Sequence, residues 1–394
     1  MSEAPLTGLR VLDFGRYIAA PYCAMVLRDM GAEVIRVERP GGEDDRRVGL
    51  LGAHGETFTF ASMARGKKGV TLDLRQAGPA REVVRDLVAR SDVLLHNFGP
   101  AAAAALGLGY EDVRQANPAI VYAAISFSGS DRLGFDMMAQ MGSGAAALTG
   151  SAGEPPLRAG VHWVDYSTGL SAVIGILLAL RQRDSTGEGQ AVECALLRTA
   201  VSFTTPAIAE AVVAGRERPR LGNQSVYTGP GNLYRCLDGH VYLSAITSST
   251  WRALARLIGC PELGADPELG TPQQSFAQRE RLDRLIEGWT ETRTVAEVVD
   301  HLERAHVPGG PSVTTAEVAG DPQVRDAGML DFVDLGEPGF ERVPVSRPPV
   351  RLPAAPARAL GSPPRPGEHN DEVYGGLLGY AAERLAALRA AGVI

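Results

Sequence analysis

Short apolar runs alternate with longer amphipathic segments through the first third of the chain. The run at 9–14 predicts a buried strand, the segment 19–30 predicts a helix that ends at Gly31, and the run at 33–38 predicts a second strand. A strand, a helix and a strand in succession imply a parallel pair joined by a right-handed crossover. The alternation continues, with strands expected at 70–74, 92–96 and 119–126 and a helix expected at 79–90. The pattern therefore predicts an α/β fold whose order resembles a nucleotide-binding half-domain.

No dinucleotide fingerprint follows the first predicted strand. Residues 15–20 read GRYIAA and lack the G-x-G-x-x-G spacing that brings a pyrophosphate against a helix N-terminus. The sequence has no P-loop either. NAD or FAD binding is therefore not expected, and an NAD-dependent enzyme is the weakest of the functions considered.

The pattern changes in the second half of the chain. Residues 127–160 are rich in glycine, serine and alanine and predict irregular structure around a site, and the apolar run 170–180 predicts a helix. Residues 335–367 are proline-rich and predict an extended arm that wraps a partner or returns to the first domain. The predicted organisation is a large domain at 1–200 completed by 335–394, a linker at 201–229, a small domain at 230–320 and a return linker at 321–366.

Asp165 stands in the sequence VDYSTG, just before the apolar run that predicts a helix. At a helix N-terminus a carboxylate is favoured by the helix dipole and by free backbone N–H groups, so Asp165 fits an ordinary N-cap. The alternative is a carboxylate nucleophile beside N–H donors that receive a developing oxyanion. Residue type alone leaves both interpretations open.

Two further positions suit a ligand. The basic turn at 65–68 fits either a solvated charge run or, together with Arg39, a patch for phosphate groups. Asn97 and Phe98 follow a predicted strand directly, and ligands of open α/β sheets lie beyond the carboxyl ends of strands.

Composition argues against several classes of protein. With 39 basic and 46 acidic residues the net charge is −7, so no nucleic-acid partner is expected. The four cysteines are widely scattered and form neither a metal-ligand spacing nor a disulfide framework, which predicts no metal and a reducing cytoplasm. The first residues do not read as a signal peptide, and the run 170–180 is too short to cross a bilayer, so no membrane partner is expected.

Several stretches together resemble the family III CoA-transferases of the CaiB/BaiF type, a group that includes formyl-CoA transferase, carnitine CoA-transferase and α-methylacyl-CoA racemase. The matching pieces cover the chain from end to end in the expected order. They are residues 8–13, 31–38, 67–74, 92–100, 134–136, Asp165-x-x-Thr168-Gly169, 187–190, 321–325 and 367–379. No single piece is decisive, but the set is specific.

The resemblance implies a large domain, built from both chain ends around a Rossmann-like parallel sheet, and a smaller α+β domain joined to it by long linkers. It also implies that two chains interlock as rings in a homodimer. Coenzyme A enters as part of an acyl-CoA donor, a carboxylic acid accepts it, and no metal is needed. The implied activity moves CoA between carboxylic acids through an aspartyl acyl anhydride and an aspartyl-CoA thioester.

Carried over by position, the resemblance makes Asp165 the acylated carboxylate. It places Phe135, Asp136 and Gly169 among the residues that bind the substrate. The residues expected to hold the adenine and phosphates of CoA are Arg39, Leu72, Arg75, Asn97 and Phe98, with the backbone around Ile18 and Ala20 against the same nucleotide.

Three departures from the family pattern bear on activity. Five alanines at 101–105 replace the usual arginine, the loop before Gly134 is short, and residues 245–250 replace a glycine-rich flap. A racemase needs an acid and a base on opposite faces of the α-carbon, but its two positions look like Phe135 and Thr247, which do not transfer protons near neutral pH. CoA transfer is therefore preferred, with a racemase or epimerase and a catalytically lapsed acyl-CoA-binding protein as alternatives.

Overall fold

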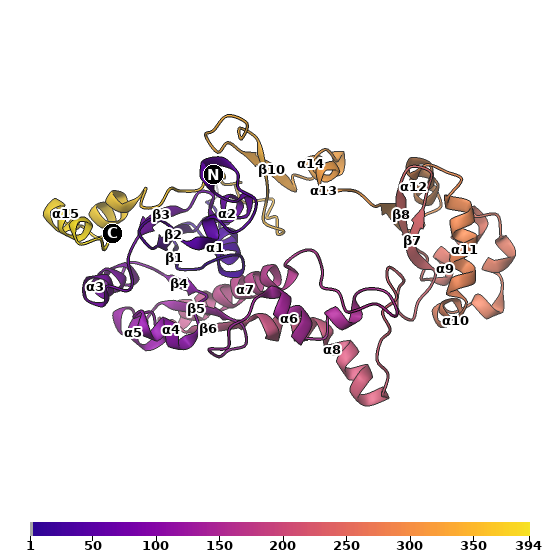
Figure 1. Ribbon diagram of the computed structural model, residues 1–394, viewed down its shortest axis with the longest axis horizontal. Coiled ribbons are helices and arrows are strands. Elements are labelled where there is room, and N and C mark those ends of the chain that lie inside the picture. The colour runs from indigo at the N-terminus through magenta and orange to yellow at the C-terminus, as the bar shows by residue number, and fades with distance from the viewer. Residues whose placement is uncertain (1–2) are drawn as a thin grey trace. The chain divides into compact units, whose positions relative to one another are not determined.

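The computed structural model describes residues 3–394, which form a large and a small unit (Figure 1). The large unit comprises the chain up to Gly144, Ala159–Thr205 and Pro322–Ile394, and the small unit comprises Ala145–Arg158 and Pro206–Asp321. Both ends of the chain therefore belong to one unit. The division differs from the predicted one, because 145–158 belongs to the small unit and the first part of the predicted linker 201–229 is helical.

A six-stranded parallel sheet forms the centre of the large unit. Its strand order, β3-β2-β1-β4-β5-β6, is that of doubly wound nucleotide-binding folds. The strands are β1 (Arg10–Asp13), β2 (Glu33–Glu38), β3 (Lys68–Thr71), β4 (Val93–His96), β5 (Val121–Ser126) and β6 (Ala191–Ala195). The α/β class and the parallel sheet are confirmed. Strand β6 is additional, since it runs into the next helix without a turn signal.

Each face of the sheet has its own hydrophobic core. Val11 belongs to one core and Leu12 to the other, as the two-residue period of a strand requires. The helices over the first core are α1 (Ala19–Asp29) and α7 (Trp163–Thr186), and those over the second are α3 (Ala77–Val88), α5 (Tyr110–Ala116) and α15 (Ala382–Ala390). Residues from the C-terminal end thus complete a core that begins with β1.

Helix α7 starts earlier and ends later than the predicted helix at 170–180, and Asp165 lies in its first turn. The small residues before Leu170 belong to the same helix. Gly169 is required there, because a Cβ atom would lie 2.7 Å from the Ala19 carbonyl oxygen of α1. By length and composition alone, α7 and α8 (Leu196–Ala214) reach the size of a membrane-crossing helix, and α7 packs its buried side against α1 and the sheet.

The remaining elements complete the two units. In the large unit they are α2 (Phe58–Ala64), α4 (Pro100–Ala105), α6 (Asp136–Gly142), α14 (Pro322–Asp326), β10 (Leu330–Val333), β11 (Val343–Ser346) and a π-helical turn at Asp371–Leu377. In the small unit they are β7 (Gly231–Arg235), β8 (His240–Ser244), β9 (Gly309–Pro311), α9 (Ser248–Leu257), α10 (Pro272–Ala277), α11 (Arg279–Thr290), α12 (Val295–Arg304) and α13 (Thr315–Val318). Strand β11 lies inside the predicted extended arm and pairs with β10 as an antiparallel hairpin, because its valines bury a small core with Ala53 and Ala61.

Candidate active site

A buried carboxylate caps helix α7. Asp136 is the first residue of α6 and is fully buried. Its Oδ2 accepts hydrogen bonds from the N–H groups of Val164 (2.8 Å) and Asp165 (3.1 Å), and its Oδ1 accepts one from Gln140 (2.5 Å). N–H groups in the first turn of a helix have no partner within that helix. Asp136, predicted to bind substrate, therefore supplies the cap that lets α7 begin at Trp163.

The Asp165 side chain has a different environment. It is half-buried, and its backbone N–H is already bonded to Asp136. Burial, and then the charge of Asp136, raises the pKa of the Asp165 carboxyl to about 7. The N-cap interpretation of Asp165 is wrong, because Asp136 binds the N–H groups that an N-cap would bind. Asp165 is instead a carboxyl group that exchanges its proton near neutral pH.

The start of α1 lies against α7 next to Gly169. Gly169 is buried, and its missing side chain allows the Ala19 carbonyl oxygen to approach α7. Ile18, the residue before the helix, is half-buried and makes no side-chain cap, so the first N–H groups of α1 have no capping side chain. Ala20 is fully buried. A Cβ atom added at Gly15 would lie 2.5 Å from the Cβ atom of Ala20. A ligand can therefore meet this turn through its backbone rather than through Ala20.

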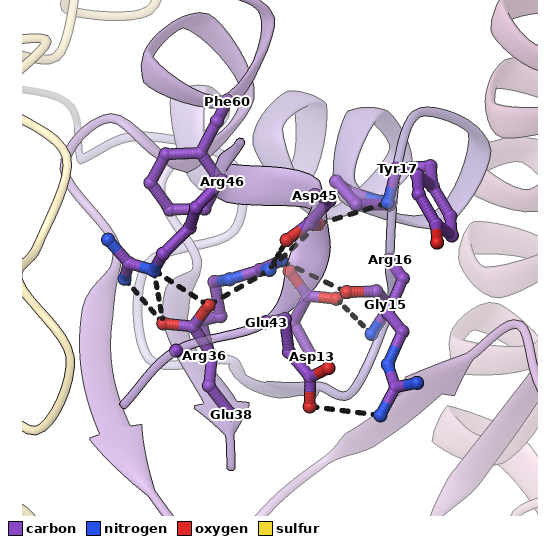
Figure 2. Close-up of polar contacts among 12 residues, drawn as sticks. Asp13, Gly15, Arg16, Tyr17, Arg36, Glu38, Glu43, Asp45, Arg46 and Phe60 are labelled. Atoms are coloured by element: carbon purple, nitrogen blue, oxygen red, sulfur yellow. Dashed lines mark hydrogen bonds and ion pairs between the residues drawn. The ribbon is translucent and has the colours of Figure 1, made fainter. Parts of the chain in front are cut away.

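Buried charged residues hold the turn that follows β1 (Figure 2). The Gly15 N–H donates to Asp13 (2.9 Å), and the Gly15 carbonyl accepts from Arg36 (3.0 Å). Asp45 accepts from the Tyr17 N–H (3.0 Å) and is bound through both carboxylate oxygens by Arg36. Breaking a buried ion pair strands an uncompensated charge. The turn is therefore held in one conformation, with Tyr17 at a φ of 66°.

Asn97 acts on this turn rather than facing a ligand directly. Its Oδ1 accepts from the Arg16 N–H (2.9 Å), and its Nδ2 donates to the Arg16 carbonyl (2.8 Å). The Arg16 guanidinium lies over the Phe98 ring, 5.0 Å from the ring centre, and pairs with Glu43 at 2.9 Å. Arg16 was not among the residues predicted to bind a ligand, although its position just after β1 is where this fold binds ligands.

A pocket of about 230 Å³ lies where β1 to β4 end. It brings together four of the predicted nucleotide-binding residues, Arg39, Leu72, Arg75 and Phe98. Its other lining residues are Phe14, Arg16, Val37, Glu38, Glu43, Asp73, Leu74 and Leu106. The pocket combines apolar walls with charged side chains, as a site for a nucleotide requires.

The two arginines predicted to bind phosphate are exposed and already paired. The Arg75 side chain is 80% exposed and bonds Asp73 at 2.8 Å. The Arg39 side chain is 46% exposed and bonds Asp44. Exposed ion pairs contribute only about 0–1 kcal/mol, whereas arginine binds phosphate through two charge-assisted hydrogen bonds. A phosphate group can therefore displace either carboxylate at small cost.

The basic turn at 65–68 is neither a solvated charge run nor an open phosphate patch. Arg65 is fully buried and bonds Asp29 at 2.5 Å. Lys67 is also buried, and its Nζ donates to Asp13 (2.7 Å) and to the Pro21 carbonyl (3.0 Å). Arg65 and Lys67 join distant elements of the large unit. They are therefore neither part of a solvated charge run nor part of a phosphate patch.

A buried histidine fixes the position of Phe98. His96 Nδ1 accepts from the Phe98 N–H (3.1 Å), and its Nε2 lies 2.6 Å from the Tyr122 hydroxyl, which donates to the Leu108 carbonyl (2.9 Å). This chain of bonds requires a neutral ring that carries its proton on Nε2. Burial lowers the pKa of His96 to about 4, so the ring stays neutral at physiological pH.

Two of the noted departures have a structural role. The alanines at 101–105 lie in α4, whose Ala101 N–H donates to Asp131 (2.8 Å). The segment 245–250 ends at the start of α9, where Thr247 is the N-cap and accepts from the Thr250 N–H (3.2 Å). Thr247 therefore caps a helix. Within residues 3–394, no group of three or more His, Cys, Asp or Glu side chains is placed to hold a metal ion.

Phe135, predicted to bind substrate, forms an aromatic pair with Tyr17. Its ring meets the ring of Tyr17 edge-on, with the centroids 6.0 Å apart. Phe135 directly precedes the capping residue Asp136, and Tyr17 belongs to the turn after β1. No local pattern connects the two positions, because they lie on separate loops of the sheet.

Known proteins are similar to this sequence along nearly all of its length. The CoA-transferase family III model matches residues 6–370. The chain is 32% identical over 397 residues to succinyl-CoA–D-citramalate CoA-transferase of Chloroflexus aurantiacus, covering 99% of this chain and 98% of that protein. It is 34% identical over 415 residues to formyl-CoA:oxalate CoA-transferase of Streptomyces coelicolor, covering 100% of both.

Solved structures share the fold as well. A CaiB/BaiF family protein from Brucella suis superimposes with a TM-score of 0.83 at 31% identity, covering 95% of this chain and 100% of that one. A protein from Mycobacterium tuberculosis superimposes with a TM-score of 0.82 at 28% identity, covering 94% of this chain and 99% of that one.

Proposed function

The chain belongs to CoA-transferase family III, and from this premise we propose that it moves CoA from an acyl-CoA to a carboxylic acid through covalent intermediates on Asp165. The relatives named above pair succinyl-CoA with citramalate and formyl-CoA with oxalate. Their acids differ, so membership of the family sets the type of reaction and leaves the donor and acceptor of this chain open.

The observation that carries the proposal is the division of roles between Asp136 and Asp165. Asp136 takes the N–H donors of α7, so the carboxyl of Asp165 is left without this stabilisation. Its raised pKa makes it a more basic nucleophile than an ordinary carboxylate, while about half of it is still ionised near pH 7. This supports a reactive role for Asp165.

The proposed reaction begins when an Asp165 carboxylate oxygen attacks the thioester carbonyl carbon. A C–O bond forms, the C–S bond breaks, and CoA leaves as a thiolate. The thiolate then attacks the aspartyl carbonyl of the anhydride, which releases the donor acid as a carboxylate and leaves an aspartyl-CoA thioester.

The second half of the reaction reverses these steps with the acceptor. The acceptor carboxylate attacks the aspartyl-CoA carbonyl, so that a new anhydride forms and CoA thiolate is expelled. Attack of this thiolate on the acceptor's acyl carbon releases the new acyl-CoA and restores the Asp165 carboxylate. Every step exchanges one nucleophile for one leaving group, and no net proton or electron is consumed.

What this protein must add is positioning and stabilisation of the oxyanion in each step. The uncapped first turn of α1, held close to α7 at Gly169, supports a role for its N–H groups as oxyanion donors. The sheet-edge pocket supports binding of the CoA nucleotide, with the base between apolar walls and the phosphates at Arg39 and Arg75. The homodimer implied by the resemblance stays a prediction, and exposed apolar side chains on α7, such as Ile174 and Leu178, support it.

The experiment that tests the function is capture of the acyl-enzyme. The protein is incubated with a panel of acyl-CoA thioesters, treated with hydroxylamine or borohydride, and analysed by intact mass and peptide mapping. We expect a modification at Asp165 whose rate falls by about 10³-fold or more in Asp165→Asn, because the nucleophile is removed.

The matched control is Asp184→Asn, which changes an exposed aspartate of the same helix. It should acylate at the wild-type rate. A modification at another residue, or washing of α-deuterium into a 2-methylacyl-CoA without any adduct, would contradict the proposed mechanism, and the second result would favour a racemase.

A further inference from the structure

We infer that Tyr17 and Phe135 form the surface that receives the acyl group, and that this surface favours acyl groups with an apolar body over those with a second carboxylate. This inference rests on the proposed function and adds a substrate class to it. Tyr17 then acts as a specificity-determining residue for the donor and acceptor acids.

The backbone of Tyr17 is the first observation. Its φ of 66° lies in the left-handed region, which a bulky side chain rarely adopts. Such strain persists only where the surroundings impose it, and residues of this kind gather at functional sites. Here the Tyr17 N–H is held by Asp45, whose carboxylate is held in turn by buried Arg36 (Figure 2).

The same network fixes the residues on either side. Asn97 binds both the N–H and the carbonyl of Arg16, and Asp13 and Arg36 bind Gly15. A turn that served only to connect β1 with α1 would need neither the strain nor so many buried charges. The network fixes the backbone of the turn and with it the direction of the Tyr17 Cα–Cβ bond.

That direction brings Tyr17 to Phe135 in an exposed aromatic pair. The rings meet edge-on with centroids 6.0 Å apart, yet Tyr17 is 39% exposed and Phe135 is 52% exposed. The pair therefore presents aromatic surface to solvent instead of burying it in the core. Neighbouring Met138 is also 51% exposed, and methionine adapts its shape to apolar ligands.

Both members of the pair lie close in sequence to residues that contact helix α7, which carries Asp165. Tyr17 lies two residues before Ala19, whose carbonyl oxygen packs on α7 at Gly169. Phe135 directly precedes Asp136, whose carboxylate accepts the Asp165 N–H. Both rings thus belong to segments that contact the start of α7, and this is why we assign the acyl group of Asp165 to their surface.

Charge makes the surface selective. Asp136 places a buried carboxylate at the start of α7, and its charge opposes a second carboxylate on an acyl group that is bound to Asp165. An apolar acyl body meets no such repulsion and covers the exposed rings. Each additional methylene in an apolar pocket changes the specificity of an enzyme by about tenfold or more.

The test measures the rate of acylation of Asp165 with acetyl-, butyryl-, phenylacetyl- and succinyl-CoA. In the wild-type protein we expect butyryl- and phenylacetyl-CoA to react at least about tenfold faster than succinyl-CoA. In Tyr17→Ala and Phe135→Ala we expect a loss of about tenfold or more for these two donors and less than about threefold for acetyl-CoA.

Three further variants separate recognition from folding. Tyr17→Phe keeps the ring and should keep the preference, whereas Tyr17→Gly relieves the backbone strain and should lose the preference without a loss of melting temperature. Phe58→Ala removes an aromatic side chain of similar exposure (38%) from α2 and should leave all four rates unchanged.

Two outcomes overturn the inference. If succinyl-CoA is the fastest donor, or if Tyr17→Ala and Phe135→Ala slow all donors equally while Asp165 is still acylated, the substrate class is wrong and the transferase mechanism stands. If no thioester acylates Asp165, the proposed mechanism and this inference fall together.

Discussion

The start of helix α7 and the pocket at the carboxyl ends of β1 to β4 differ in how their charged side chains are paired. At α7, Asp136 takes the backbone donors, and the raised pKa of Asp165, about 7, leaves about half of this carboxyl protonated near pH 7. In the pocket, Arg39 and Arg75 are exposed, and each holds a carboxylate that a competing anion can displace. A reactive carboxyl group is obtained by withholding stabilising partners, whereas a reversible phosphate site keeps its partners exchangeable.

The largest effect is expected from Asp165→Asn on stability. Ionising a carboxyl whose pKa is about 7 when folded, against an ordinary value of about 4, destabilises the folded state by on the order of 4 kcal/mol at 1.36 kcal/mol per pKa unit. Because the folded pKa is higher than the unfolded one, the folded state binds the proton of Asp165 more tightly. The stability that this protonated carboxyl contributes is fully present below pH 4 and is lost as the pH rises through 7. Asparagine stays neutral throughout.

Urea unfolding at several pH values measures this effect. The variant should match the wild type near pH 4 and exceed it by a few kcal/mol at pH 8. A difference that does not change with pH would mean that the pKa of Asp165 is the same in the folded and unfolded states, and the contrast with Asp136 would be lost.

A smaller effect of opposite sign is expected from Asp136→Asn. Asparagine is a weaker acceptor for the N–H groups of α7, so stability at pH 7 should fall by about 1–3 kcal/mol. Loss of the neighbouring charge should also move the pH midpoint of Asp165 acylation below 7, since that charge contributes to the raised pKa. If stability falls but the midpoint stays in place, Asp136 is a cap alone.

The smallest effect is expected at the pocket. Arg39→Gln and Arg75→Gln should each raise the KM for an acyl-CoA by about threefold to tenfold, with less dependence on salt and little change in kcat, because each loses one exposed phosphate contact. Arg181→Gln, on an exposed part of α7 (81%), is the control and should change neither constant. If Arg39→Gln and Arg75→Gln leave the KM at the wild-type value, as the control should, the CoA phosphates bind elsewhere.

Much of this arrangement could be predicted from local sequence. The alternation of apolar runs predicted the strands β1 to β5 and the parallel pairing of the first two, and the family resemblance is confirmed by the comparisons. The resemblance implied that Arg39, Leu72, Arg75 and Phe98 hold the CoA nucleotide, and the structure brings these four residues to one pocket where β1 to β4 end. These features depend on periodicity and on contacts between neighbouring elements.

Features that depend on distant partners were mispredicted or missed. The start of α7 was placed too late, because its cap comes from Asp136 on another helix. The basic turn was expected at the surface, yet Lys67 finds its partner in Asp13, 54 residues away. The aromatic pair of Tyr17 and Phe135 joins two loops that no periodic pattern relates.

The sequence by itself determined the class of fold, the family and the candidate nucleophile, because these reside in apolar spacing and in short motifs that act over a few residues. Only the tertiary structure decided which carboxylate caps α7, which carries a proton near neutral pH and which cations are buried. The strength of a charge depends on burial and on partners brought together by folding, and a linear pattern contains neither.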